Sequence, residues 1–273
     1  MNELDLQQVD KATTKLESEY LKIMNESYNA SLKDVQGRIA KIYSKYSIDG
    51  KLDLQLMSKK DIKKMPRLYK LFANIDKDLS SLNRGKPQQL SSYLTDAYLV
   101  NREGTAAAIQ SVANASFDVI SREQVYQSAL NPLSKLALQS NAQAIKINIQ
   151  RSITASILQG EGIQKMSRRI KKDLQTNANR AVTIARTETT KIVNQARDDI
   201  LVEAQGMGIN VKKEWVSAQD DRVRATHAAL NGEIRDMDKP FSNGLMRPGD
   251  PSGPPSQIIN CRCTMVGVLP DYE

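Results

Sequence analysis

The sequence predicts an α+β protein in which the N-terminal two thirds is mostly helical and a small C-terminal α+β domain follows. Apolar residues recur at three- and four-residue steps through most of residues 1–208, which is typical of amphipathic helices. Aromatic residues make up only 5% of the chain, which favours helix-packed cores of Leu, Ile and Ala. After residue 208 the pattern changes to alternation and then to a Pro- and Gly-rich loop, so a second kind of domain begins there.

The length and charge of the chain limit its functions. At 273 residues it can bury one large core or two modest ones. Its net charge of +8 favours a polyanionic neighbour such as nucleic acid. The N-terminus lacks the basic and apolar regions of a signal peptide, and no window approaches the apolar length of a membrane span. We therefore expect a protein of the cytoplasm, or of something assembled there, with no membrane span.

Long amphipathic helices are expected in the first region, residues 1–160. One long helix, or a helical pair, covers about 4–46, and Ser47 to Gly50 give a turn signal. Apolar spacing predicts further helices at 59–82, 90–100, 106–119 and 132–159. Small residues within 106–115 permit close contacts between helices, and Gly160 and Gly162 end the helical region.

The second region, residues 161–208, is predicted as basic helices that link to the C-terminal domain. The helices are expected at 163–174 and 179–204, with Gly206 and Gly208 closing the second. The candidate DNA-binding residues are Lys165, Arg168, Arg169, Lys171, Lys172 and Arg180. Lys and Arg neutralise phosphates without reading bases, and no aromatic residue lies among them to stack on bases. This surface predicts sequence-independent DNA contact, and a solvated helix face is the alternative.

The third region, residues 209–273, is the predicted C-terminal α+β domain. A strand is expected at 209–216 and a short helix at about 222–230. Residues 241–256 are rich in Pro and Gly, so they form neither a helix nor a central strand and must be a long ordered loop or a flexible arm. A closing strand is expected at about 264–269.

The rare residues of the chain gather in this last region and include candidate metal ligands. The only Trp, the only His and both Cys are Trp215, His227, Cys261 and Cys263. His and Cys suit zinc, and Asp220, Asp221 or a water molecule could complete a tetrahedral structural site. Alternatively, both Cys pack as small apolar residues near a hydrogen-bonded His. A disulfide between them is disfavoured because a bridge across one residue is strained.

The same residues include the nucleophile, base and carboxylate that a thiol enzyme uses. Cys261 could be the nucleophile and His227 the base, with Asp220 or Asp221 to orient it. However, Cys261 and Cys263 alternate along an expected strand and share one face, which suits metal binding or packing better than nucleophilic catalysis. We therefore expect no catalytic residues.

The helix before the last domain carries Arg186 and Glu188. We expect them to form structural ion pairs, or to tie this helix to the polar cluster around Asp221 and Arg224. A likeness to the Arg-Ser-Glu triads of ADP-ribosyltransferases is superficial, because no strand carries the Arg and no Glu-x-Glu follows.

Three motifs in this order resemble the phage head morphogenesis family, the Mu F-like minor head proteins. The resemblance covers about residues 160–268: the helix with Arg186 and Glu188, the run from Trp215 to His227, the Pro/Gly loop and the Asn-Cys-Arg-Cys close. The motif residues expected to be structural are Arg186, Glu188, Trp215, Asp221, Arg224, Asn260 and Arg262. Nothing residue-specific is carried onto the N-terminal half.

The resemblance implies a minor capsid component of a tailed phage, with no enzymatic activity. Its implied roles are head morphogenesis and DNA packaging or ejection, with the portal protein, the major capsid or scaffold protein and packaged double-stranded DNA as partners. Its implied location is the virion, in the head interior or portal region, after assembly in the host cytoplasm. The alternatives are a zinc- or thiol-dependent enzyme acting on nucleic acid or the host envelope during phage entry, and a free nucleic-acid-binding protein.

Overall fold

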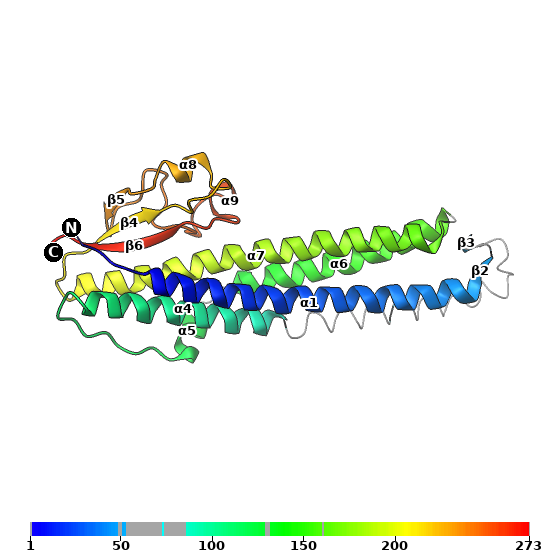
Figure 1. The fold of residues 1–273 in the computed structure, drawn as a ribbon, viewed down its shortest axis with the longest axis horizontal. Coiled ribbons are helices and arrows are strands. Elements are labelled where there is room, and N and C mark those ends of the chain that lie inside the picture. Colours follow the sequence, from blue (N-terminus) through cyan, green and yellow to red (C-terminus); the bar gives the residue numbers. More distant parts are fainter. Residues whose placement is uncertain are drawn as a thin grey trace. The chain divides into compact units, whose positions relative to one another are not determined.

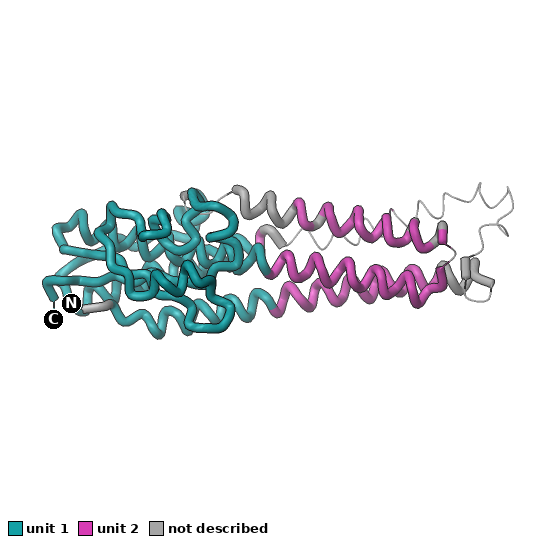
Figure 2. The backbone as a smooth tube through the Cα atoms, turned by 90° about the horizontal axis from the view of Figure 1, so that it is seen from above, with its two compact units in different colours: residues 1–21, 89–134, 183–273 teal, residues 22–88, 135–182 magenta. Residues whose placement is uncertain are grey.

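The computed structural model describes residues 2–48, 51–52, 73, 86–128, 132–159 and 161–272. These residues fall into two compact units (Figure 2). Unit 1 contains residues 1–21, 89–134 and 183–273, and unit 2 contains residues 22–88 and 135–182. The sequence predicts three consecutive regions. Each compact unit, by contrast, combines segments that are distant from one another in the sequence.

Long helices dominate the N-terminal two thirds, as the apolar spacing predicts (Figure 1). They are α1 (Gln7–Tyr46), α4 (Lys86–Gln110), the short α5 (Arg122–Ser128), α6 (Pro132–Leu158) and α7 (Ile163–Gly206). The first is one helix of 40 residues rather than a helical pair. None of the helices in the described ranges is long and apolar enough to cross a membrane.

Two short strands follow α1. They are β2 (Ser47–Ile48) and β3 (Lys51–Leu52), which pair antiparallel around the predicted turn. The turn residues 49–50 themselves, and the helix predicted at 59–82 apart from residue 73, lie outside the described residues.

The predicted helix at 106–119 is wrong beyond residue 110. Helix α4 covers the predicted helix at 90–100 and the first part of the one at 106–119. It ends at Gln110, and the chain is irregular from there up to residue 121. The Ser111 hydroxyl donates to the Ala108 carbonyl, a local bond that competes with helix continuation. Val119, which belongs to the apolar pattern, is 92% exposed. The apolar spacing that includes Val119 therefore does not reflect packing in a core.

The predicted break between helices at 174 and 179 is also wrong, because α7 is continuous over 44 residues. Asn177 lies between the two predicted helices. Its side-chain amide donates to the Asp173 carbonyl at 2.7 Å, within the helix. This bond occupies the polar group that would otherwise compete with the helix backbone.

Unit 1 contains a four-stranded antiparallel sheet, with three strands from the C-terminal part and one from the N-terminus. Its strands, in the spatial order β1-β6-β4-β5, are β1 (Asn2–Glu3), β6 (Thr264–Leu269), β4 (Lys212–Val216) and β5 (Ile234–Asp236). The sequence predicts β4 and β6, and β6 has the predicted bounds. Strands β1 and β5 have only two and three residues, too few to show an alternating pattern.

The sheet packs along the C-terminal half of α7 (Figure 1). Gly267 allows this approach, because a Cβ there would lie 2.5 Å from Leu201 Cδ2 and 2.9 Å from Leu4 Cδ1. Trp215, Ile200 and Met265 are fully buried in the core of unit 1. The close approach explains why a glycine occupies the middle of a strand.

Unit 2 has a core of its own between helical stretches. Ile145, Ile149 and Ile153 recur every four residues on α6 and are buried, as are Met166 and Ile170 on α7. This spacing places each set on one helix face. The predicted Leu- and Ile-based helix packing is therefore present.

Unit 2 should lose stability at alkaline pH because of a buried tyrosine. Burial raises the pKa of Tyr28 to about 12, although a hydrogen bond from Asn141 opposes the shift. Between the ordinary tyrosine pKa of about 10 and this value, only the unfolded chain loses the proton. Across this range, the free energy of unfolding of the wild-type protein should fall by about 2 kcal/mol more than that of the Tyr28→Phe variant. Circular dichroism during urea unfolding at pH 9 and pH 12 would check this, and equal losses in both proteins would contradict it.

Candidate functional site

A row of polar side chains on α7 binds the backbone of the Asn-Cys-Arg-Cys segment. Its members, here called the α7 polar ladder, are Thr187, Thr190, Asn194 and Arg197. Their spacing of three, four and three residues places them on one helix face. At its start, the backbone N–H of Asn260 donates to Thr187 Oγ1 at 2.9 Å, and the Thr190 hydroxyl donates to the Cys261 carbonyl. The ladder therefore fixes the backbone around the first cysteine.

The second half of the ladder fixes the backbone around the second cysteine and the start of β6. Asn194 Nδ2 donates to the Cys263 carbonyl at 3.2 Å, and Asn194 Oδ1 accepts the N–H of Met265 at 2.7 Å. Asn194 is fully buried, so the protein itself must satisfy these groups. The segment thus has its register against α7 set by side chains.

Arg197 is a fully buried cation that ties several elements to this segment. Its guanidinium donates to Asn101 Oδ1 at 2.9 Å and to the Met265 carbonyl at 3.1 Å, and it forms an ion pair with Asp10. Burial lowers the pKa of Arg197, and the Asp10 carboxylate opposes this shift. The buried charge is tolerated because it has both an ion partner and hydrogen-bond acceptors.

His227, Cys261 and Cys263 meet in one buried cluster, here called the His–Cys cluster. His227 lies on the short helix α8 (Ala225–Ala228), and the cysteines come just before β6. Each Sγ lies 3.5 Å from His227 Nδ1, and the three atoms are all within 4.8 Å of one another. The cysteines share a face as predicted, although they lie in an extended segment rather than in a strand.

Neighbouring groups fix the histidine ring. His227 Nε2 lies 2.7 Å from Gln257 Oε1, on the side opposite the sulfurs. Trp215 of β4 packs edge-to-face against the ring with centroids 5.2 Å apart. In the tautomer in which Nε2 donates to Gln257 Oε1, the Nδ1 lone pair faces both sulfurs.

The two thiols have different protonation tendencies. The hydrogen bond from Cys261 lowers the pKa of Cys263, and the contacts with His227 and the Ala218 backbone act in the same direction. The same sulfur–sulfur contact, together with burial, raises the pKa of Cys261. Of the two thiols, Cys263 is therefore the more acidic.

The structure does not bring Asp220 into the His–Cys cluster. Its carboxylate accepts two bonds from Arg262, one of them at 2.7 Å, and this bonding lowers the pKa of Asp220. Arg262 points away because it alternates with the flanking cysteines. Asp221 is exposed, and Arg224 donates to the Ile259 carbonyl at 2.5 Å. Arg262 and Arg224 therefore bind loop groups on either side of the cluster.

Arg186 and Glu188 form ion pairs, but not with each other. Arg186 pairs with Glu17 of α1 at 3.2 Å, and Glu188 pairs with Lys191 at 2.8 Å. Of the polar cluster to which a tie was predicted, Arg224 donates to the Ile259 carbonyl and Asp221 is exposed. Each of the two residues thus forms an ion pair, as a structural role would require.

The Pro/Gly loop is ordered by residues that the sequence did not single out. The ammonium group of Lys213, fully buried, donates to the carbonyls of Met237 and Met246 at 3.1 and 2.8 Å. Asp250 accepts the N–H groups of Met246 and Ser252. Arg247 pairs with Asp198 of α7 at 3.2 Å. Because these bonds fix the loop from Met246 to Ser252, it is an ordered loop rather than a flexible arm.

The candidate DNA-binding residues lie on the part of α7 in unit 2. Lys165 and Arg169 pair with Glu161 at 2.8 and 2.7 Å. The remaining four are exposed: Arg168, Lys171, Lys172 and Arg180. These four are the residues of the set best placed for phosphates.

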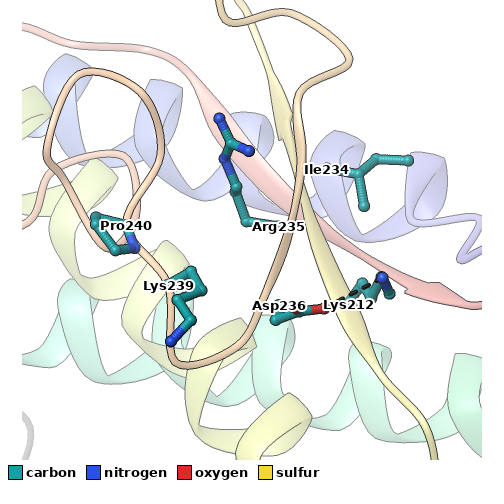
Figure 3. Close-up of a pocket in the computed structure, with 6 residues that line it drawn as sticks. All are labelled: Lys212, Ile234, Arg235, Asp236, Lys239 and Pro240. Carbon is teal, nitrogen blue, oxygen red and sulfur yellow. Dashed lines mark ion pairs between the residues drawn. The ribbon is translucent and has the colours of Figure 1, made fainter.

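A shallow pocket of about 470 Å³ lies beside the edge strand β5 (Figure 3). Lys212 and Asp236 in its wall form an ion pair at 3.2 Å, and Arg235 pairs with Glu233 at 2.6 Å. Its charges are therefore largely paired with one another. The pocket brings together none of the residues predicted for the site.

The chain is similar to known proteins over two different lengths. Residues 147–266 match the family described as phage Mu protein F like protein. The chain is 26% identical over 272 residues to minor head protein GP7 of Bacillus phage SPP1, covering 96% of this chain and 86% of that protein. No solved structure matches the chain.

Two further relatives match only a part. NAD(+)–arginine ADP-ribosyltransferase EFV of Enterococcus faecalis is 30% identical over 127 residues, which are 45% of this chain and 26% of that protein. An uncharacterized protein of Haemophilus influenzae is 29% identical over 126 residues, which are 46% of this chain and 25% of that protein. The chain thus spans about a quarter of the length of both.

Proposed function

We propose that this chain, which belongs to the Mu F-like family of phage head proteins, is a minor head protein of a tailed phage and acts in head morphogenesis. The observation that carries the proposal is the similarity to a minor head protein along 96% of this chain. It extends beyond the family match at 147–266 into the N-terminal helices. The chain is accordingly assigned to the virion, in the head interior or portal region, after assembly in the host cytoplasm.

The portal protein and the major capsid or scaffold protein are the proposed protein partners. The fold supports a role in assembly, because buried polar residues of unit 1 join loops, sheet and helix. Internal hydrogen bonds to backbone or side-chain groups occupy the polar side-chain atoms of Arg197, Asn194 and Lys213. Such internal bonding suits a component that presents a surface to other head proteins.

A stop codon early in the gene tests this role. In the phage or induced prophage that encodes the chain, we expect fewer infectious particles, and a plasmid copy should restore the yield. Heads of altered number or DNA content in electron micrographs would support the proposal. An unchanged yield of normal, infectious particles would contradict it.

We also propose sequence-independent contact with packaged double-stranded DNA through the exposed basic face of α7 in unit 2. The four residues Arg168, Lys171, Lys172 and Arg180 are the candidates, and the chain carries a net charge of +8. Phosphate contacts of this kind weaken with salt because bound counterions are released from DNA.

Replacing Lys171 and Lys172 with Gln should weaken DNA binding and reduce its salt dependence. Because the double variant neutralises two fewer phosphates, the slope of log K against log salt should become less steep by about 1.8. Replacing Lys11 and Lys15, exposed lysines one turn apart on α1, makes the same charge change as a control. Fluorescence anisotropy with two duplexes of unrelated sequence measures both. An equal effect of the two double variants would contradict the assignment.

The proposed role is structural and not catalytic. The similarity to an ADP-ribosyltransferase covers only 26% of that protein. In this chain the Arg186 guanidinium pairs with Glu17 on a helix surface. Glu188 likewise pairs with a lysine of its own helix. These ion pairs support a structural use of both residues.

A further inference from the structure

We propose that His227 Nδ1, Cys261 Sγ and Cys263 Sγ bind one zinc ion. All three side chains are buried, with exposed fractions of 1%, 2% and 2%. In a tetrahedral zinc site with ordinary bond lengths, a nitrogen and a sulfur ligand lie about 3.6 Å apart. Both sulfurs here lie 3.5 Å from Nδ1. Both nitrogen–sulfur distances therefore match those of a tetrahedral zinc site.

Hydrogen bonding to Nδ1 can serve only one of the two thiols, and Cys261 donates to Cys263. The neutral histidine ring has one acceptor nitrogen, and its lone pair can accept a proton from only one thiol. Both sulfurs nevertheless approach the same Nδ1 atom. A metal ion would engage all three ligand atoms at once. Two thiolates would also neutralise Zn²⁺, which keeps the cost of burying the ion small.

The surroundings resemble the outer shell of a metal site. Ligating histidines usually donate their second ring N–H to a fixed acceptor, and Gln257 Oε1 lies 2.7 Å from Nε2. Ser217 Oγ donates to the His227 carbonyl at 2.6 Å and holds the short helix α8. The α7 polar ladder fixes the cysteine backbone. The ligands are thus held in place by groups other than the metal.

The fourth zinc position is assigned to a water molecule. In the described parts of the chain, no other His, Cys, Asp or Glu side chain joins the cluster. A pocket of about 260 Å³ whose lining includes Thr190, Asn194 and Cys263 gives room for water nearby. The ion would join α8 to the cysteine segment, as a cross-link within unit 1.

Metal content measures the proposal directly. Full-length protein expressed with added zinc and purified without chelator should contain one zinc ion per chain by plasma mass spectrometry. Cys261→Ser and Cys263→Ser should each lose most of it. Val266→Ala, in the same core but without a ligand atom, should keep it. Folding of each variant is checked by circular dichroism.

Two further measurements do not depend on whether the cysteine variants fold. Co²⁺ added to the wild-type apoprotein should give thiolate-to-cobalt absorption and quench the fluorescence of Trp215, the only Trp. Gln257→Ala should weaken zinc binding by about 10- to 100-fold while leaving the stoichiometry unchanged at saturating zinc.

The proposal is overturned by folded wild-type protein that takes up neither zinc nor cobalt. It is also overturned by metal content that survives in folded forms of both cysteine variants. Neither result bears on the proposed head-protein function, which is tested on particles.

Discussion

Replacing Arg197 with Leu should lower the free energy of unfolding by about 3–5 kcal/mol, because the change leaves buried polar groups without partners. The guanidinium is fully buried and is the donor to Asn101 Oδ1 and to the Met265 carbonyl. Leu supplies no donor for either group. Urea unfolding followed by Trp215 fluorescence reports on unit 1, because this single Trp is buried in its core.

Arg186→Leu is the matched control on the same helix. Arg186 is 37% exposed and forms a single ion pair with Glu17, so its loss should cost less than about 1 kcal/mol. Equal effects of the two substitutions would show that Arg197 does not anchor the segment through its buried bonds.

Asn194→Leu should have the second large effect, a loss of about 2–4 kcal/mol. Leu has a similar size but leaves the Met265 N–H and the Cys263 carbonyl unpaired in the core, and each unpaired group costs about 1–3 kcal/mol. The same unfolding measurement applies. Loss of these bonds should also loosen the backbone at Cys263, which hydrogen exchange at Met265 would reveal.

Asn179→Leu serves as the comparison for this change. Asn179 is exposed on α7, where its side chain accepts a bond from Gln175 of the same helix. Its replacement should alter stability by no more than about 0.5 kcal/mol. A stable Asn194→Leu protein with unchanged exchange at Met265 would argue against the α7 polar ladder.

The sequence predicted the helices and main strands because their apolar patterns are long enough to read. Helix α1 and strand β6 follow such patterns, whereas β1 and β5 are too short to show one. Helix ends were less predictable. Asn177 and Ser111 are both polar, yet one continues a helix through a bond to its own turn and the other lies just past a helix end.

The His–Cys cluster was predictable because the chain has one His and two Cys, and all lie in the last sixty residues. Asp220 was predicted as a further metal ligand, but its pairing with Arg262 became clear only from the fold. Thr190 and Asn194 were overlooked because Thr and Asn on helices commonly bond to their own helix backbone. Only the approach of the cysteine segment gives them a second role.

Lys213 shows a different limit of pattern reading. It shares a strand face with Trp215, and the alternation of β4 places that face inward. A lysine on a buried face is unexpected until its acceptors are known. Those acceptors, the carbonyls of Met237 and Met246, come from residues far along the chain.

The protein composition of purified particles tests the proposed head-protein role most directly. Particles from the phage that encodes this chain would be purified on a density gradient, and the chain quantified by mass spectrometry before and after DNA release. We expect the chain in full particles at low copy number. Loss on emptying would identify a protein that leaves with the DNA, and retention would identify a portal or shell component. Absence from both full and emptied particles would contradict the account.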